Sequence, residues 1–199
     1  MLTVSGAEPP LVKNTPVFTV NNSPGTSAVV NLPANVAGDL LIVTTNFWTG
    51  GNPPVATPSG WTALGGTVLQ SGSSLQSFYR VSTGGLTSVT FSNPPNQALA
   101  AVALCFPAGS FGSVSCTGSA VNSADPAPIS MSGPFTAVAV INFVGTSVNT
   151  FPLPNNQLTS SSGTVGVCTG PANGSIDPSP FGVTGVVVGG CQTIAVGAP

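Results

Sequence analysis

The chain has 199 residues, of which only two are basic and four are acidic, while 41% are hydrophobic. Two basic side chains are too few to bind the phosphates of a nucleic acid or an anionic membrane surface, and no apolar run approaches the ~20 residues that span a bilayer. Intrinsic disorder is excluded as well, because disordered chains are usually rich in charge and poor in apolar residues.

Residues 1–37 predict short strands separated by turns. Residues 17–20 and 28–32 are rich in β-branched side chains, and Asn22-Ser23-Pro24-Gly25 between them is a turn signal. Five prolines in this part exclude a long helix. The first eight residues lack the basic start and apolar core of a signal peptide, so we expect synthesis and folding in a cytosol.

Residues 38–106 contain the most regular pattern. Residues 40–47 predict a buried strand, and residues 87–92 a β-rich one. In residues 75–81 both alternating faces carry an aromatic side chain, which predicts a strand covered on both sides. Residues 98–106 allow a helix, because Ala and Leu favour helices, but the prolines that flank this short segment favour a strand.

The second half echoes the first after a loop-rich bridge, residues 107–134, which holds a possible short strand at 113–116. An apolar strand follows at 135–144. The remaining predicted strands are 164–169, 182–188 and 191–196.

The whole pattern predicts an all-β chain of about twelve strands with no assigned helix. Turn signals every 8 to 12 residues favour an antiparallel β-sandwich formed as a single domain by residues 1–199. The echo between the halves favours two four-stranded sheets wound like a jelly roll.

The sequence contains no catalytic motif, and its composition argues against most known chemistries. It contains no His for an acyl-transfer triad, no phosphate-binding glycine motif and no acid-rich calcium loop. The four acids are far apart in sequence, which argues against a glycosidase pair. We therefore expect a protein that is not an enzyme and that has no catalytic residue, metal or cofactor.

Two charged residues stand out. Asp39 precedes the first core strand and Arg80 lies in the aromatic strand, so they can form an ion pair, or Arg80 can reach a neighbouring subunit. The alternative is that Asp39 caps a turn and Arg80 packs its stem on Phe78 or Trp61.

Trp61, Phe78, Tyr79 and Phe91 are candidate core aromatics, with an aromatic platform for sugar as the alternative. The four cysteines form no Cys-x-x-Cys pair, and cytosolic folding favours free thiols over disulfides. If a disulfide forms, Cys105 with Cys116 is the first pairing to test.

The central stretch resembles a β-sandwich domain of tailed-phage structural proteins. The matching motifs are Gly38-Asp39-Leu40-Leu41, Thr57-Pro58-Ser59-Gly60-Trp61-Thr62, Tyr79-Arg80-Val81, Thr87-Ser88-Val89-Thr90-Phe91 and the Ala-rich segment 98–106. They cover about a third of the chain. In the second half residues 136–144 stand where a further strand of this type is expected, but without Gly-Asp.

The resemblance implies a virion protein in the tail or on the head, without catalytic residues. The low charge and the lack of a fibre-like segment favour a cement or decoration protein on the capsid surface, bound to the major capsid protein and to copies of itself, as a homotrimer. The alternatives are a tail-tip module whose loops 49–54 or 152–162 touch a host receptor, and a carbohydrate-binding protein.

Overall fold

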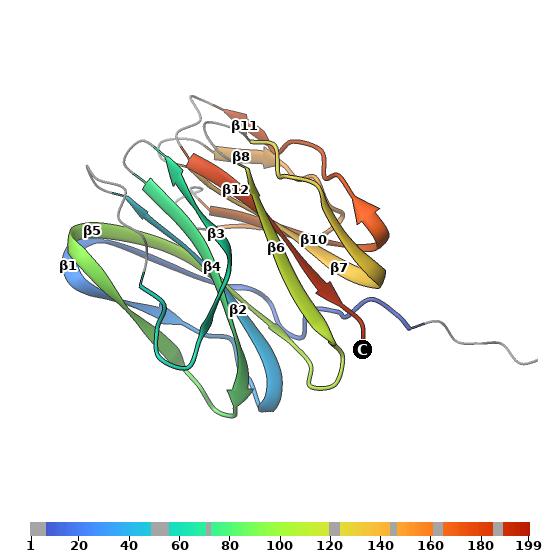
Figure 1. The fold of residues 1–199 in the computed structure, drawn as a ribbon. Helices are drawn as coiled ribbons and strands as arrows, with labels where there is room; N and C mark the ends of the chain where they lie inside the picture. Colours follow the sequence, from blue (N-terminus) through green and yellow to red (C-terminus); the bar gives the residue numbers. More distant parts are fainter. Residues whose placement is uncertain are drawn as a thin grey trace, which may run out of the picture.

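The computed structural model describes residues 7–48, 56–70, 73–119, 124–143, 147–160, 165–184 and 189–199. The described chain is all-β, which confirms the predicted fold class (Figure 1). Its strands are β1 Val17–Asn31, β2 Ala37–Trp48, β3 Thr62–Gln70, β4 Ser73–Thr83, β5 Ser88–Phe106, β6 Ser113–Ser119, β7 Ile129–Phe143, β8 Ser147–Thr150, β9 Asn155–Thr159, β10 Val165–Ile176, β11 Gly182–Thr184 and β12 Gly189–Gly197.

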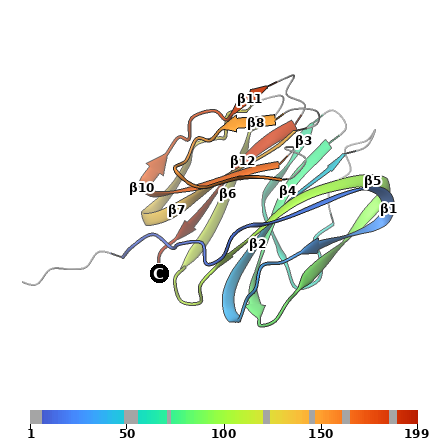
Figure 2. The same cartoon turned by 180° about the vertical axis from the view of Figure 1, so that it is seen from behind.

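The strands form two five-stranded sheets and a small two-stranded one, in a sandwich-like arrangement seen from both sides in Figures 1 and 2. Sheet A has the order β1-β5-β2-β4-β3, sheet B the order β6-β12-β7-β10-β9, and β8 pairs with β11. All pairings are antiparallel. Each half of the chain therefore builds its own sheet.

This partition differs from the expected jelly roll, which is not confirmed. In a jelly roll two Greek keys distribute their strands over both sheets, whereas here β1 to β5 all belong to sheet A. Each main sheet also has five strands instead of four. The expected bridge of residues 107–134 contains β6 and the start of β7, and the short strand expected at 113–116 extends to residue 119.

The two halves share one topology. If β8 and β11 are set aside, both sheets place their strands in the order first, fifth, second, fourth, third along the chain. The sheets also stack in opposite order, because β3 contacts β6, β4 contacts β12 and β5 contacts β10. The second half thus faces the first as one subunit faces the other in a twofold dimer.

Apolar side chains from the inner faces of both sheets form the central core. Fully burying a Val, Leu, Ile or Phe side chain of this core contributes about 1.5–3 kcal/mol. The core residues are Leu40, Ile42, Leu64, Ala100, Val102, Leu104 and Phe106 of sheet A, and Val138, Val140, Val165, Val167, Ile194 and Val196 of sheet B.

The outer face of sheet A is covered by its own longest strands. β1 pairs with residues 99–103 of β5, passes through two register shifts, and then pairs with residues 88–92. The far ends of both strands bend back over β2 and β4, where Phe91 lies 5.2 Å from Phe78 and 6.3 Å from Phe47 between ring centroids. The sequence had predicted separate strands at 17–20 and 28–32 and at 87–92 and 98–106; each pair is one strand.

Residues 98–106 form a strand, as predicted. Ala100, Val102 and Leu104 face sheet B, whereas Leu99 and Ala101 face the bent ends of β1 and β5. Because both faces are buried, every position is apolar and the alternation expected of a half-exposed strand is lost.

The outer face of sheet B is covered by the chain between β7 and β12. Leu153, Phe181 and partly buried Phe151 pack there on Ala137, Ala139 and Ile141 of β7. Both main sheets are therefore covered on two faces, which explains how so apolar a chain hides its core.

Candidate functional site

The most elaborate polar contact in the described residues surrounds Asp39, whose side chain is only 1% exposed. Lys13 Nζ donates to Asp39 Oδ2 at 2.6 Å, and the N–H of Val36 donates to the same oxygen at 2.8 Å. The N–H of Ala108 donates to Oδ1 at 3.0 Å, and Cys105 Sγ lies 3.6 Å from Oδ2. One carboxylate thereby joins the N-terminal segment, β2, β5 and the loop after β5.

These contacts set the ionisation of Asp39. Burial by itself raises the pKa of this carboxyl, but the hydrogen bonds from Lys13, Val36, Ala108 and Cys105 outweigh burial and hold the pKa below its ordinary value of 3.8. Asp39 is therefore ionised at neutral pH.

The expected Asp39–Arg80 ion pair is wrong, because the salt bridge of Asp39 is made by Lys13. No local pattern pointed to this partner, since Lys13 lies 26 residues away from Asp39 in a proline-rich segment. The alternative for Asp39 is confirmed, because its carboxylate caps the turn at Val36. Arg80 is half-buried, and its guanidinium lies over Gly60, where an added Cβ would come 3.1 Å from Nη1.

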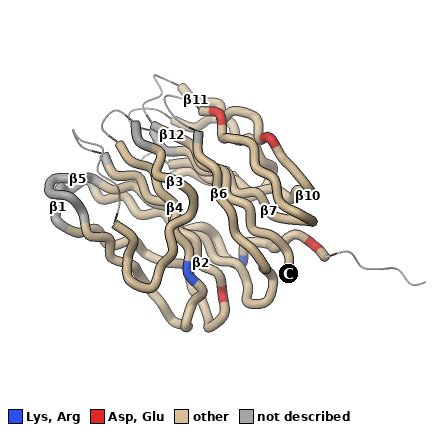
Figure 3. The backbone as a smooth tube through the Cα atoms, viewed as in Figure 1, with Lys and Arg blue, Asp and Glu red and all other residues tan. Residues whose placement is uncertain are grey.

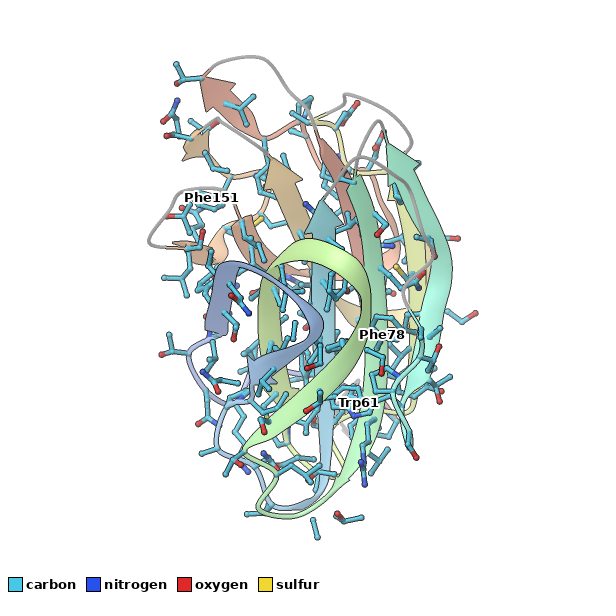
Figure 4. The ribbon with its side chains drawn as sticks, turned by 90° about the vertical axis from the view of Figure 1, so that its left-hand side faces the viewer. Trp61, Phe78 and Phe151 are labelled. Carbon is cyan, nitrogen blue, oxygen red and sulfur yellow. The ribbon has the colours of Figure 1, made fainter. Side chains whose placement is uncertain are left out.

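The candidate core aromatics are mostly buried. Trp61 is 8% exposed, Phe78 and Phe91 are 0% exposed, and all three belong to the core on the outer face of sheet A. Tyr79 is half-buried and packs against the central core on the other face. Figure 4 shows Trp61 and Phe78 near each other beside the curled part of β5. Side chains buried in this way cannot offer an exposed platform to a sugar, so the residues expected for that alternative do not form one.

All four cysteines are free thiols, as favoured from the sequence, and the alternative Cys105–Cys116 disulfide is not formed. Burial raises the pKa of the Cys116 and Cys168 thiols to about 12, and burial with the nearby Asp39 charge does the same for Cys105. Burial also raises the pKa of Cys191. Such thiols stay protonated and unreactive at neutral pH.

A buried hydrogen-bonded chain joins the two sheets. Thr44 Oγ1 and Ser77 Oγ lie 2.7 Å apart, and Ser77 Oγ donates to Gln192 Oε1 at 2.6 Å. Gln192, which is 0% exposed, also donates from Nε2 to the carbonyl of Gly66 at 3.4 Å. No sequence signal pointed to these residues, because isolated Ser, Thr and Gln are common on exposed strand faces.

An open cleft of about 460 Å³ lies between the N-terminal segment and the β9–β10 edge of sheet B. Apolar Leu11, Val12 and Pro171 line it together with Asn155 and Asn156, and Glu8 stands at its rim as the sole charged lining residue. The sequence did not indicate this cleft, because its walls come from segments more than 120 residues apart.

The expected contact loops are only partly visible. Residues 49–54 lie outside the described residues, and so do residues 161 and 162 of the second loop. In the described part of that loop Leu153 is 3% exposed and belongs to the core, so it is not available to a partner.

The described residues show neither a candidate metal site nor a candidate membrane-spanning helix. No three His, Cys, Asp or Glu side chains there lie close enough together to hold a metal ion. The same residues include no helix with the length and apolarity needed to cross a membrane.

Comparison of the chain with protein-family models, with curated proteins and with solved structures gives no match. The link to tailed-phage proteins therefore depends on the motifs of residues 38–106 alone.

Proposed function

We propose that this chain is a non-enzymatic structural protein of a phage virion: a capsid cement or decoration protein that stabilises the head shell. It acts as a homotrimer on the capsid surface and contacts both the major capsid protein and its own copies. The support is the motif resemblance of residues 38–106 together with the surface chemistry described next.

The observation that carries the proposal is the lack of charge on the sheet edges. The edge strands are β1, β3, β6 and β9, and none of them contains Asp, Glu, Lys or Arg. Free soluble β-proteins commonly protect such edges with charges or bulges. β1, β3 and β9 have irregular registers, but β6 pairs with β12 over all its seven residues without a bulge.

The distribution of charge over the whole molecule supports the same proposal. Figure 3 shows that the few charged positions are scattered over the fold, with most of the backbone bare of charge. A surface of this kind promotes association. In a virion the contacts between subunits are permanent and repeated many times, so a surface that promotes association suits a structural role.

The proposal is tested on phage particles in which the gene for this chain is disrupted. We expect their heads to release DNA at lower temperature than wild-type heads, and purified protein added back to restore the wild-type release temperature. Heads that are equally stable with and without the protein would contradict a cement role.

A pair of variants tests the edge argument in the same assay. Ser115→Lys puts a charge on the exposed edge strand β6, and Ser130→Lys puts one on an exposed position of β7 that pairs with β10 and lies before the residues paired with β12. We expect Ser115→Lys to fold but to restore head stability poorly, and Ser130→Lys to act like wild type. Equal restoration of head stability by both variants would contradict a role of the β6 edge in association.

A further inference from the structure

We propose that the cleft beside the N-terminal segment receives residues 1–6 of a neighbouring copy, so that copies of this chain exchange their N-terminal segments. The inference deepens the proposed function, because it names the contact through which copies associate, and it rests on that proposed association.

One wall of the cleft is an extended segment with unused peptide groups. Residues 7–16 belong to no sheet, yet the segment is fixed in place. Thr136 donates its hydroxyl to the carbonyl of Pro10, and the N–H of Lys13 donates to the carbonyl of Cys105 at 2.7 Å. Between these two anchors the peptide groups of Leu11 and Val12 have no hydrogen-bond partner among the described residues. They are available to pair with another extended chain.

The opposite wall supplies fixed amide groups. Asn156 has a left-handed backbone with φ of 48°, the single such non-glycine residue in the described chain, and its Nδ2 donates to Thr169 Oγ1 at 2.8 Å. Asn is among the few non-glycine residues that adopt this conformation readily, and Asn156 lies near the start of β9 on the cleft wall. Exposed Asn155 stands beside it. Amide side chains can both donate to and accept from a peptide backbone.

The residues that line the cleft favour an extended, uncharged peptide as the bound segment. They include no Lys or Arg to hold a phosphate and no aromatic ring to stack on a sugar. Pro9, Leu11, Val12 and Pro171 instead offer small apolar contacts, and 71% of the Leu11 side chain is exposed. An apolar side chain this exposed gains by being covered.

Residues 1–6 have the composition and the position to be this peptide. Leu2, Thr3 and Val4 alternate apolar and polar side chains, and residues 1–6 carry no charged side chain. The described chain starts at Ala7, directly beside Glu8 on the cleft rim. Glu8, Pro9, Leu11 and Val12 of the same chain already form one wall of this cleft, so we assign the peptide that pairs with this wall to a second copy. Repeated head-to-tail exchange can close a ring of three.

The test uses disulfide trapping between full-length copies. One variant carries Leu2→Cys and a second carries Asn155→Cys, and the two are mixed under mild oxidation. The native thiols do not interfere, because their raised pKa values keep them protonated. We expect a covalent dimer from the mixture, and none when Asn155→Cys is replaced by Val29→Cys, which is exposed on β1.

Two outcomes would overturn the inference. The first is the absence of a covalent dimer in the mixture. The second is a bond that forms only within the double variant Leu2→Cys/Asn155→Cys, because that result would put the segment into its own cleft. If neither variant cross-links while particles contain the protein in high copy number, the exchange is refuted and the proposed function stands.

A sedimentation experiment supplies a second readout. Deletion of residues 1–6, or Leu11→Asp in the full chain, is expected to raise the dissociation constant between copies by about tenfold or more. The control is Val81→Asp, which changes another exposed apolar side chain, 49% exposed, on β4. An unchanged dissociation constant for the deletion and for Leu11→Asp would contradict the exchange.

Discussion

At the scale of single residues, the described structure concentrates its electrostatic interactions at Asp39. Four donors converge on one carboxylate that is almost completely buried. The sequence identified Asp39 as the residue to examine but assigned the wrong cation, because the path of residues 7–16 across the molecule has no local signature. Proline content could exclude a helix there, but it could not say which strand the segment would meet.

Substitutions of Asp39 and of Lys13 should lower the free energy of unfolding by different amounts. Asp39→Asn leaves Lys13 without its counter-charge and weakens the caps of Val36 and Ala108, so we expect a loss of about 2–4 kcal/mol in the free energy of unfolding. Lys13→Met should cost roughly 1 kcal/mol or less, because 31% of the Lys13 side chain is exposed. Urea denaturation measures both. Equal losses for the two variants would contradict the account.

The same residues predict how stability depends on pH. The pKa of Asp39 is lower in the folded than in the unfolded chain, so its contribution is present above pH 3.8 and is lost as pH falls through the folded value. The Cys105, Cys116 and Cys168 pKa values are raised from 9.0 to about 12, so stability should also fall as pH rises above 9.

Urea denaturation across the pH range measures both limbs of this profile. Asp39→Asn should flatten the acid limb and leave the alkaline limb intact. An acid limb that is unchanged in Asp39→Asn would assign the acid sensitivity to other carboxyls.

At the scale of elements, the bent pair β1 and β5 is the feature that sequence patterns described least well. Pro24, Pro94 and Pro95 interrupt the β-rich runs, and a break in pattern normally marks the end of a strand. Here both strands bend together and the same ladder resumes beyond the register shifts. The sequence pattern predicted the β-rich pieces. It could not predict that these pieces join into the continuous strands β1 and β5, because their far ends are held by packing on the outer face of sheet A.

The cover made by β1 and β5 can be tested at Phe91. Phe91→Ala removes a ring packed against Phe47 and Phe78, so we expect a loss of about 3–5 kcal/mol in the free energy of unfolding. Val29→Ala on the same bent pair should cost less than about 0.5 kcal/mol, because Val29 is 49% exposed. If Phe91→Ala were as mild as Val29→Ala, the bent ends would not be packed as described.

At the scale of the whole molecule, two sheets of the same topology stack face to face in opposite order. The echo between the halves of the sequence favoured two four-stranded sheets wound as a jelly roll, whereas each half builds its own five-stranded sheet. Strand pairing is decided by long-range contacts such as Ile42 with Leu104 and Val138 with Ile194, and local composition does not encode those partners.

The candidate site was less predictable than the fold. Residue types suggested two alternatives, a disulfide and an aromatic platform for sugar. The cysteines are free thiols and the aromatic side chains are mostly buried, so neither alternative holds. The cleft and the inter-sheet chain of Thr44, Ser77 and Gln192 join distant segments, so no spacing rule could reveal them. The composition did show that the chain carries almost no charge. In the fold, the edge strands of the two main sheets, β1, β3, β6 and β9, carry no charged side chain at all.

The measurement that tests the central claim most directly is the copy number of this protein per phage particle, by quantitative mass spectrometry of purified virions against the major capsid protein. A decoration protein that contacts the shell throughout the head should be present in hundreds of copies. A few to a few tens of copies would place the chain in the tail and favour contact with the host. Absence from the particles would contradict the virion role altogether.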